Sequence, residues 1–316
     1  MSDRVELSII IVNWNSADYL RGCLLSLYRE TRGITFEVIV VDNASYDGCG
    51  EMIAREFPGA QFIQSGRNLG FAGANNLAFE SSCGRNILFL NPDMKLISAA
   101  INILLEHLND LPDAGIVGCR LLNADGSLQT TSILKFPTIL NSLLEMEALR
   151  LRWPRLWGIE ALFFNDGKPA RVEALCGACM LARREVFEAI GRFSEEYFMY
   201  SEEIDLCFKA ERAGFRNYFC GDATMIHYGG RSSSAAWQTV TKVKAEMQFV
   251  SKWRGRSYAY AFRVGLAMKA LARLIALYLL WPVRKVIGKR GAVEAAVAKW
   301  TATLKTLVSL GFGEVS

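Results

Sequence analysis

The sequence lacks a long hydrophobic run, a secretory leader and a high proline content, and each absence excludes a class of protein. In its C-terminal region the longest uncharged run, 274–283, has 10 residues, whereas a membrane-spanning helix needs roughly 20. The N-terminus, MSDRVELSIIIVNW, has acidic residues before its apolar stretch and no small-residue cleavage site, so no signal peptide is predicted. Only seven prolines and an apolar fraction of 51% argue against disorder. We therefore expect a folded cytoplasmic protein.

The sequence also lacks several common ligand-binding signatures. Only Cys176 and Cys179 of its eight cysteines form a CxxC pair, and no second pair or nearby histidine completes a zinc site. Buried packing is therefore the favoured interpretation of these thiols. The glycine-rich segment GRNLGFAGANN, 66–76, is neither GxGxxG nor a Walker loop, because no Gly-Lys-Ser/Thr follows it.

Strands rich in β-branched residues alternate with helical patterns over the first 120 residues. Because these strands are continuously apolar, we predict an α/β fold with a mostly parallel sheet and helices on both faces. Further along, a helix is predicted over 202–213, and two short extended pieces follow at 215–220 and 223–228. The earlier predicted strands are 7–13, 36–43, 61–64, 86–91 and 115–119, and the predicted helices are 17–29, 48–57, 71–81 and 98–108.

Charge divides the chain into two regions. Residues 1–230 contain 21 Lys and Arg against 29 Asp and Glu (net −8), whereas residues 231–316 contain 15 against 3 (net +12). The basic region mixes its cations with Trp, Tyr and Leu, which is typical of amphipathic helices at a membrane surface. Packing on the rest of the protein is the alternative, and nucleic acid is disfavoured because apolar residues interrupt the cations. We predict a first domain, 1–235, made of two halves, 1–120 and 121–235, followed by a membrane-associating helical region, 236–316.

Polar side chains follow three of the predicted strands. Asn13 and Asn15 end the first strand, Asp42 ends the second, and Pro92 directs the chain out of the sheet just before Asp93. In open α/β sheets, ligands bind at the carboxyl ends of the strands. Each residue alone is explained by a turn or a helix cap, but together they favour a nucleotide-binding cleft.

The glycine-rich segment adds an anion-binding hypothesis. Gly70 and Gly73 bracket a predicted helix start, and Arg67 precedes it. Backbone N–H groups at a helix N-terminus and a bidentate arginine both suit a diphosphate. We therefore predict contacts with a bound nucleotide diphosphate from Arg67, Asn68, Gly70, Gly73 and Asn76.

A second acidic cluster lies in the first turn of the helix predicted to begin at Glu202. Capping and the helix dipole account for some of its carboxylates, Glu202, Glu203 and Asp205. They also follow an aromatic run, where burial can tune a carboxylate as a base. His227, one of two histidines, ends an extended segment before glycines, whereas His107 lies among leucines and is interpreted as a boundary residue.

These segments, in this order, resemble the family 2 glycosyltransferases, and most of all the bacterial rhamnosyltransferases that build cell-surface polysaccharide on a lipid carrier. The likeness covers residues 6 to about 233 and is more specific for the family than for the sugar. It rests on SIIIVNWNS, VVDNAS, GRNLGFAGANN, FLNPD, CGACML, FMYSEEIDLCFKAERAG and HYGGRS.

The resemblance implies a GT-A fold, a nucleotide-diphosphate sugar donor and a divalent cofactor, Mg²⁺ or Mn²⁺. It makes 1–235 the catalytic domain, with a nucleotide-sugar-binding half (1–120) and an acceptor-side half (121–235). By matching positions, Asp42 contacts the base, Asp93 and His227 hold the ion, and Glu203, with Glu202 beside it, is the catalytic base. The metal motif departs from the family pattern because an amide, Asn91, replaces an aspartate, so the ion is expected to be held loosely or mostly by the diphosphate. Glutamate also replaces the commoner aspartate at the base position, which leaves both glutamates as candidates.

The implied reaction inverts the anomeric centre. A sugar, L-rhamnose from dTDP-rhamnose, moves from a dTDP- or UDP-linked donor to a hydroxyl of a polyprenyl-diphosphate-linked saccharide at the inner face of the cytoplasmic membrane. A nucleotidyltransferase is disfavoured because LSIIIVNWNS lacks an early glycine-rich loop with Arg and Lys. An inactive sugar-nucleotide-binding or membrane-assembly subunit is the other alternative, and Asp93, Glu203 and His227 count against it.

Overall fold

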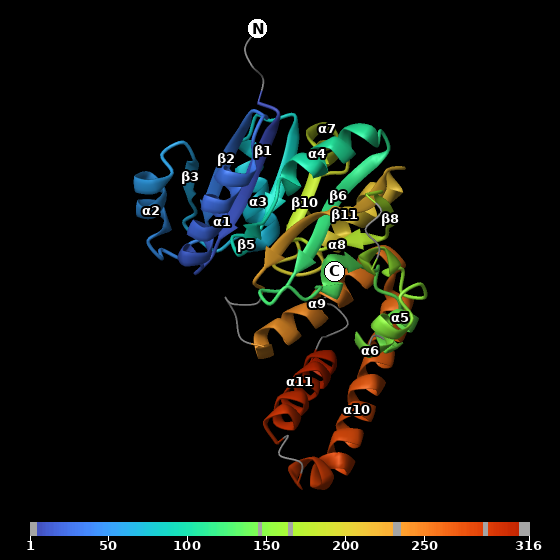
Figure 1. Ribbon diagram of the computed structural model, residues 1–316. Helices are drawn as coiled ribbons and strands as arrows, with labels where there is room; N and C mark the ends of the chain where they lie inside the picture. Colours follow the sequence, from blue (N-terminus) through green and yellow to red (C-terminus); the bar gives the residue numbers. More distant parts are fainter. Residues whose placement is uncertain (1–4, 145–146, 164–166, 230–234, 287–289, 310–316) are drawn as a thin grey trace. The chain divides into compact units, whose positions relative to one another are not determined.

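The computed structural model describes residues 5–144, 147–163, 167–229, 235–286 and 290–309 (Figure 1). The chain forms two compact units. Unit 1 comprises Met1–Phe136, Arg150–Phe198 and Glu202–Ser232, and unit 2 comprises Pro137–Leu149, Met199–Ser201 and Ser233–Ser316. The end of the HYGGRS motif, 230–232, lies outside the described residues.

Unit 1 begins with the predicted βα series. Four parallel strands pair in the order β3-β2-β1-β4, and the predicted bounds agree with the structure to within one or two residues. The strands are β1 (Leu7–Asn13), β2 (Phe36–Asp42), β3 (Gln61–Gln64) and β4 (Asn86–Leu90), and the helices that connect them are α1 (Ala17–Glu30), α2 (Cys49–Glu56) and α3 (Gly70–Glu80).

The second half of the sheet is mixed. Strand β10 (Cys179–Arg183) lies antiparallel between β4 and β6 (Ala114–Leu122). The sequence predicts a mostly parallel sheet and does not predict this strand. The two extended pieces predicted at 215–220 and 223–228 form one strand, β11 (Arg216–His227), with a register shift between Cys220 and Thr224. In the described residues the sheet has nine strands, completed by β5 (Met94–Leu96) and β8 (Ala170–Val172).

Helices cover both faces of the sheet, as predicted. Leu7, Ile9 and Ile11 of β1 pack with α1, α2 and α4 (Ala100–Asp110) in one buried cluster. On the other face, alternate strand residues meet an aromatic cluster whose rings lie 4.8–5.5 Å apart between centroids. Both faces are buried, which explains the continuously apolar strands. The aromatic cluster consists of Phe79 on α3, Phe89 on β4, Phe187 on α7 (Arg184–Ala189) and Phe193.

Shorter elements complete the part of unit 1 that carries the predicted acidic cluster. Helix α8 (Glu202–Arg212) confirms the helix predicted over 202–213. The middle of the chain contains short pieces only, and there Trp153 is exposed whereas Trp157 is buried. These pieces are η1 (Thr130–Ser132), β7 (Ile133–Leu134), α6 (Glu147–Arg152), η2 (Glu160–Phe163) and β9 (Ala174–Leu175).

Unit 2 is helical, as predicted for the basic region. Its long helices are α9 (Ala235–Arg254), α10 (Arg256–Val286) and α11 (Arg290–Ser309), and α5 (Ile139–Leu144) packs against α10. Residues with hydrophobic side chains, among them Phe249 and Phe262, form its core. Within the described ranges, no helix combines the length and the apolar character needed to cross a bilayer.

Candidate active site

The carboxyl ends of β2, β1 and β4 meet at one edge of the sheet. Asn13, the last residue of β1, lies opposite Asp42, the last residue of β2. On its other side β1 pairs with β4, where Ile11 lies opposite Leu90. The turn that carries Asp93 therefore starts at the same edge, one strand beyond Asn13. Because neighbouring strands are about 4.8 Å apart, the ends of β2 and β4 are separated by roughly 10 Å along this edge, and Asp93 follows three residues after β4.

Strands β5 and β11 bring Asp93 and His227 together. His227 pairs with Met94 across these antiparallel strands, and the Tyr228 N–H donates to the Asp93 carbonyl oxygen at 3.0 Å. As a result, His227 Nε2 lies 3.4 Å from Asp93 Oδ1, with the side chains 15% and 14% exposed. The two residues predicted as metal ligands face each other, although neither is near the other in sequence.

Gln129 determines which nitrogen of His227 faces Asp93. Its amide nitrogen donates to the His227 carbonyl oxygen at 2.6 Å and to Asn123 Oδ1 at 2.9 Å. Its Oε1 is therefore the acceptor 3.0 Å from His227 Nδ1, so Nδ1 carries the hydrogen and, in the neutral ring, Nε2 carries the lone pair. That lone pair faces a carboxylate oxygen, and the two repel unless a cation or a proton lies between them. This arrangement fits a divalent cation.

A third carboxylate, Glu203, packs beside the turn at 176–178. A Cβ placed on Gly177 would be 3.4 Å from the Cβ of Glu203, which comes from the first turn of α8. Burial, and then the charges of Glu203 and Asp93 among other groups, raise the pKa of the Cys176 thiol to about 12. One buried thiol thus lies close enough to both carboxylates to be affected by their charges. The turn at 176–178 is therefore near both Glu203, the candidate base, and Asp93, the candidate metal ligand.

Glu202 and Glu203 have different surroundings. Glu202 is 5% exposed, and among the described residues its Oε2 has no hydrogen-bond partner. Burial, followed by the charge of Glu203, raises the pKa of Glu202 well above its ordinary value. Glu203 is only partly buried. Of the two candidates, Glu203 is therefore the one with the more exposed side chain.

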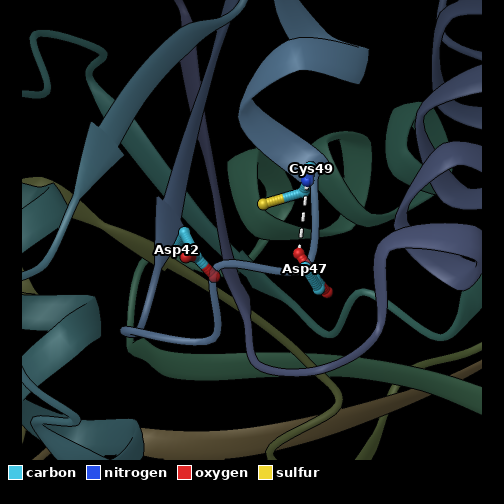
Figure 2. Close-up of side chains that lie close together, drawn as sticks. All are labelled: Asp42, Asp47 and Cys49. Atoms are coloured by element: carbon cyan, nitrogen blue, oxygen red, sulfur yellow. Dashed lines mark hydrogen bonds between the residues drawn. The ribbon is translucent and has the colours of Figure 1, made fainter.

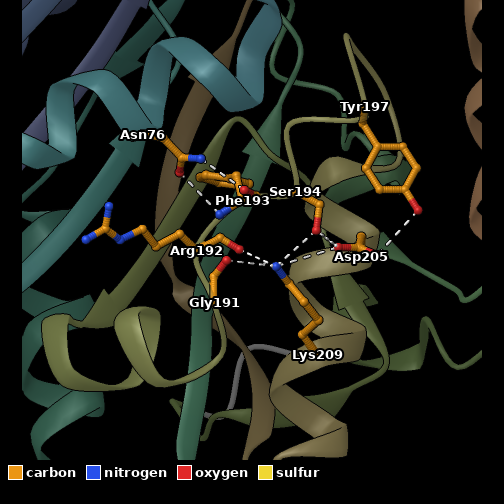
Figure 3. A network of polar contacts seen from close by, with 8 residues as sticks. All are labelled: Asn76, Gly191, Arg192, Phe193, Ser194, Tyr197, Asp205 and Lys209. Atoms are coloured by element: carbon orange, nitrogen blue, oxygen red, sulfur yellow. Dashed lines mark hydrogen bonds and ion pairs between the residues drawn. The ribbon is translucent and has the colours of Figure 1, made fainter. Parts of the chain in front are cut away.

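Asp205, the third acid of the cluster, is part of a structural network (Figure 3). It is fully buried and accepts hydrogen bonds from Ser194 Oγ at 2.6 Å and from the Tyr197 hydroxyl at 3.3 Å. Lys209 Nζ lies 3.7 Å from its Oδ2 and also donates to the Arg192 carbonyl oxygen. Asp205 and Lys209 together hold the loop before α8 against the helix.

Asn76 belongs to the same network and not to a nucleotide site. Its amide nitrogen donates to the Phe193 carbonyl oxygen at 2.9 Å, and its Oδ1 accepts from the Phe193 N–H at 3.3 Å (Figure 3). The amide nitrogen also donates to Glu195 Oε1 at 2.9 Å. Both ends of the amide are thus engaged inside unit 1. The predicted contact between Asn76 and the donor has no support in this geometry.

The anion-binding site predicted at the N-terminus of α3 is also not supported, because its backbone N–H groups have protein acceptors. The Gly70 N–H donates to Asn68 Oδ1 at 2.9 Å, and the Phe71 N–H donates to the Phe198 carbonyl oxygen at 3.0 Å. Gly70 has φ +72°, and a Cβ there would lie 2.2 Å from that carbonyl oxygen. Gly73 likewise fits closely against Leu69. These glycines and Asn68 serve packing and capping, because protein acceptors already occupy the first N–H groups.

Asp42 is fully buried and already has four donors. Ser45 Oγ and Asn13 Nδ2 donate to its Oδ1, while the Tyr46 N–H and Gln64 Nε2 donate to its Oδ2 at 3.0 and 2.8 Å. Burial opposes ionisation of Asp42, but these hydrogen bonds outweigh it and lower its pKa. A carboxylate has about four lone-pair positions. A nucleobase can therefore bind Asp42 only by displacing one donor, and Gln64 is the exposed one.

Asp47 and Cys49 lie close to Asp42, and the ligand atoms of the three residues are within 4.8 Å of one another (Figure 2). Such a group has donor atoms for a cation. However, Asp47 already accepts the N–H groups of Ser16 and Ala17 at 2.9 Å, so it caps α1. Burial, together with Asp47, raises the pKa of the Cys49 thiol, which keeps the sulfur protonated. The fit to a metal is better at Asp93 and His227.

The same sheet edge holds strained backbone and exposed side chains. Asn15, Ala44 and Tyr46 have φ of 51°, 62° and 52°, values that L-residues rarely adopt and that concentrate at functional sites. Asn15 and Arg67, which were both predicted to bind the nucleotide, are exposed there and remain accessible to a ligand. The Tyr46 ring is 68% exposed.

Sequence reasoning missed Tyr46, Asp47, Gln64 and Gln129. The Asp47-Gly48 dipeptide before a predicted helix was a local signal for a turn and cap. Gln129 had no local signal, because its partner His227 is distant in sequence.

The sequence profile of glycosyl transferase family 2 matches residues 8–191. The chain belongs to this family. It is therefore a glycosyltransferase, and its sequence relatives include rhamnosyltransferases. It is 28% identical over 240 residues to the N-acetylglucosaminyl-diphospho-decaprenol L-rhamnosyltransferase of Mycobacterium tuberculosis, covering 72% of this chain and 77% of that one. It is 31% identical over 226 residues to a low-salt glycan biosynthesis hexosyltransferase of Haloferax volcanii, covering 70% and 67%.

Solved structures share the fold of this family 2 enzyme. The mannosyltransferase PcManGT of Pyrobaculum calidifontis, in complex with GDP-Man and Mn²⁺, matches with a TM-score of 0.58 at 18% identity over 95% of this chain and 88% of that one. GalNAc-T7 with UDP, GalNAc and Mn²⁺ matches with a TM-score of 0.58 at 15% identity, and the chain spans about half (49%) of its length. The predicted GT-A architecture is thereby confirmed.

Proposed function

We propose that this enzyme transfers L-rhamnose from dTDP-rhamnose, with inversion, to a hydroxyl of a polyprenyl-diphosphate-linked saccharide. The observation that supports the proposal is the approach of His227 to Asp93 in the turn after β4, with Glu203 packed beside the turn at 176–178. The relatives named as rhamnosyltransferases support the sugar, and the Mycobacterium tuberculosis relative, named for a diphospho-decaprenol substrate, supports the acceptor.

The donor lies along the sheet edge in this proposal. Its thymine N3–H donates to Asp42 in place of Gln64, and its diphosphate lies near Asp93, in the turn that follows β4. Asp93 and His227 hold a divalent ion, Mg²⁺ or Mn²⁺, and the imidazole ligand favours Mn²⁺. The bound ion supplies positive charge that stabilises the leaving diphosphate. Arg67, exposed at the same edge, adds a cation to that charge.

Glu203 is the catalytic base of the proposed reaction. The acceptor oxygen attacks the anomeric carbon from the face opposite the diphosphate and forms the new C–O bond. The old bond between the anomeric carbon and the phosphate oxygen breaks, and its electron pair leaves with dTDP. Glu203 takes the proton of the acceptor hydroxyl, while Glu202 beside it stays protonated and adds no charge.

Helix α10 supports the predicted peripheral location at the inner face of the cytoplasmic membrane. Hydrophobic side chains at intervals of three or four residues are exposed along it, which is the spacing of one helical face. The chain from 231 to 316 carries a net charge of +12, which suits anionic headgroups. The exposed residues are Tyr260, Val264, Met268, Leu271, Ile275 and Leu279.

The test is a transfer assay with purified protein. A panel of dTDP- and UDP-sugars is incubated with polyprenyl-diphosphate-linked N-acetylglucosamine, with Mn²⁺, Mg²⁺ or EDTA, and the product's anomeric configuration is determined by NMR. We expect transfer from dTDP-rhamnose, dependence on the ion and an inverted linkage. Donor binding without transfer from any sugar nucleotide would instead identify an inactive sugar-nucleotide-binding subunit.

A further inference from the structure

Unit 2 contains a cavity of about 540 Å³ among α9, α10, α11 and α5. Its volume is within the range of about 300–1,000 Å³ that is typical of small-molecule sites. Three lysines line it, Lys242 on α9, Lys269 on α10 and Lys299 on α11, and Trp300 lies among them. All the lining residues belong to unit 2.

The cavity lining has excess positive charge. Glu246 is its single acidic residue, and Glu246 Oε1 lies 3.9 Å from Lys242 Nζ, one helical turn away. Lys269 and Lys299 thus give the lining a net charge of about +2. Cations in a concave site with low-dielectric walls attract an anion more strongly than the same cations on a flat surface.

Trp300 lies within cation–π range of both of these lysines. The ammonium nitrogens of Lys269 and Lys299 lie 5.8 and 5.7 Å from the centroid of its indole ring. Lys269 Nζ also donates to the Ser142 carbonyl oxygen on α5, so its position is fixed from two sides. Both ammonium groups line the cavity, and an anion with several acceptor oxygens can form charge-assisted hydrogen bonds with such groups.

We propose that this cavity binds the phosphate groups of a lipid, the diphosphate of the polyprenyl-linked acceptor. This inference rests on the proposed function. The ammonium groups suit the phosphate oxygens, and the apolar lining from Val243 and Leu266 suits the first part of a hydrocarbon chain. Leu266 lies on α10, the helix that also carries the exposed hydrophobic side chains. Unit 2 then recognises the lipid carrier itself, in addition to the membrane surface.

The test measures binding of farnesyl diphosphate, a soluble lipid diphosphate, by isothermal titration calorimetry on the full chain. EDTA is present so that metal-dependent binding of diphosphate in unit 1 does not contribute. Inorganic pyrophosphate and phosphatidylglycerol vesicles are measured in parallel. We expect the double variant K269Q/K299Q to weaken farnesyl diphosphate binding at least about tenfold, because two charge-assisted contacts are lost.

The matched control is K244Q/K305Q, which removes two exposed lysines of α9 and α11 that do not line the cavity. It should change binding less than about twofold. Equal weakening by both double variants would overturn the proposal, as would pyrophosphate or phosphatidylglycerol binding as tightly as farnesyl diphosphate. Circular dichroism melting checks that all variants fold. Because the experiment requires neither donor nor turnover, its failure is distinct from failure of the transfer assay.

Discussion

His227 Nε2 lies 3.4 Å from Asp93 Oδ1, and the strand pairing of β5 with β11 fixes this approach. The relationship depends on Gln129, whose amide is oriented by two acceptors and which therefore sets the protonated nitrogen of His227. The partners of a metal-binding imidazole commonly change metal affinity or activity by about 10- to 100-fold when they are removed.

Gln129→Ala should therefore weaken Mn²⁺ binding about 10- to 100-fold in the presence of dTDP. The ring of His227 can then rotate or change tautomer. Mn²⁺ electron paramagnetic resonance measures the free ion directly, without turnover. Gln129→Glu keeps an acceptor oxygen for Nδ1–H and should recover much of the affinity, and equal loss in both variants would contradict this role.

Glu203→Gln should lower the rate of transfer by about 10²- to 10⁴-fold, because an amide cannot accept the acceptor's proton. Donor binding, measured by calorimetry with dTDP, should stay unchanged. Glu202→Gln replaces a buried and protonated side chain, so it should retain most of the rate. A larger loss in Glu202→Gln than in Glu203→Gln would reverse the assignment of the base.

Glu202 should also make stability depend on pH. Its pKa is raised in the folded protein, so its stabilising contribution is complete below the unfolded pKa, about 4.3, and is lost as pH rises towards the folded pKa. Relative to wild type, Glu202→Gln should gain stability above about pH 4.5, by up to about 1.4 kcal/mol per pH unit. Urea unfolding at several pH values measures this. A difference that is constant with pH would show that Glu202 is ionised in the folded protein.

Gly70→Ala should destabilise unit 1 by roughly 3 kcal/mol or more. The new Cβ would lie 2.2 Å from the Phe198 carbonyl oxygen, and φ is +72°. Gly48→Ala is a matched control, because its φ is +84° but nothing lies within 4 Å of the new Cβ. It should cost only about 1–2 kcal/mol. Thermal melting of both variants gives the comparison, and equal losses would argue against the close packing of Gly70.

The exposed face of α10 should govern binding to vesicles and not folding. Leu271→Ser with Ile275→Ser removes two half-exposed apolar side chains, so the melting temperature should change little. Binding to phosphatidylglycerol vesicles, measured by co-sedimentation, should fall by on the order of tenfold or more. Leu25→Ser on α1 removes a similarly exposed leucine and should leave vesicle binding unchanged. Unaltered binding of the double variant would exclude this face as the contact.

Local periodicity was sufficient to predict the early elements of unit 1. The runs that became β1 and β2 are apolar at every position because both faces of the sheet are covered, and this leaves a clear signal in the sequence. The antiparallel insertion of β10 and the single long β11 were not predicted. Strand partners far apart in sequence are chosen by packing, which leaves little local trace.

Glycine and asparagine were the most misleading residues of the candidate site. Gly70 indicated an anion cradle, but its open backbone accommodates the Phe198 carbonyl oxygen instead. Asn76 indicated a donor ligand, but it holds the backbone at Phe193. A small or polar residue serves a ligand and a buried contact equally well, so its type alone cannot separate the two.

The sequence by itself determined the family, the βα series, the basic helical region and the identity of the residues at the ends of the strands. These depend on order and composition, which are local properties of the chain. Only the tertiary structure decided that His227 faces Asp93, that Gln129 orients it, and that Glu202 is buried while Glu203 is only partly so. The reason is physical: charge state and hydrogen-bond direction are set by neighbours across the fold, and those neighbours come from segments that the sequence keeps far apart.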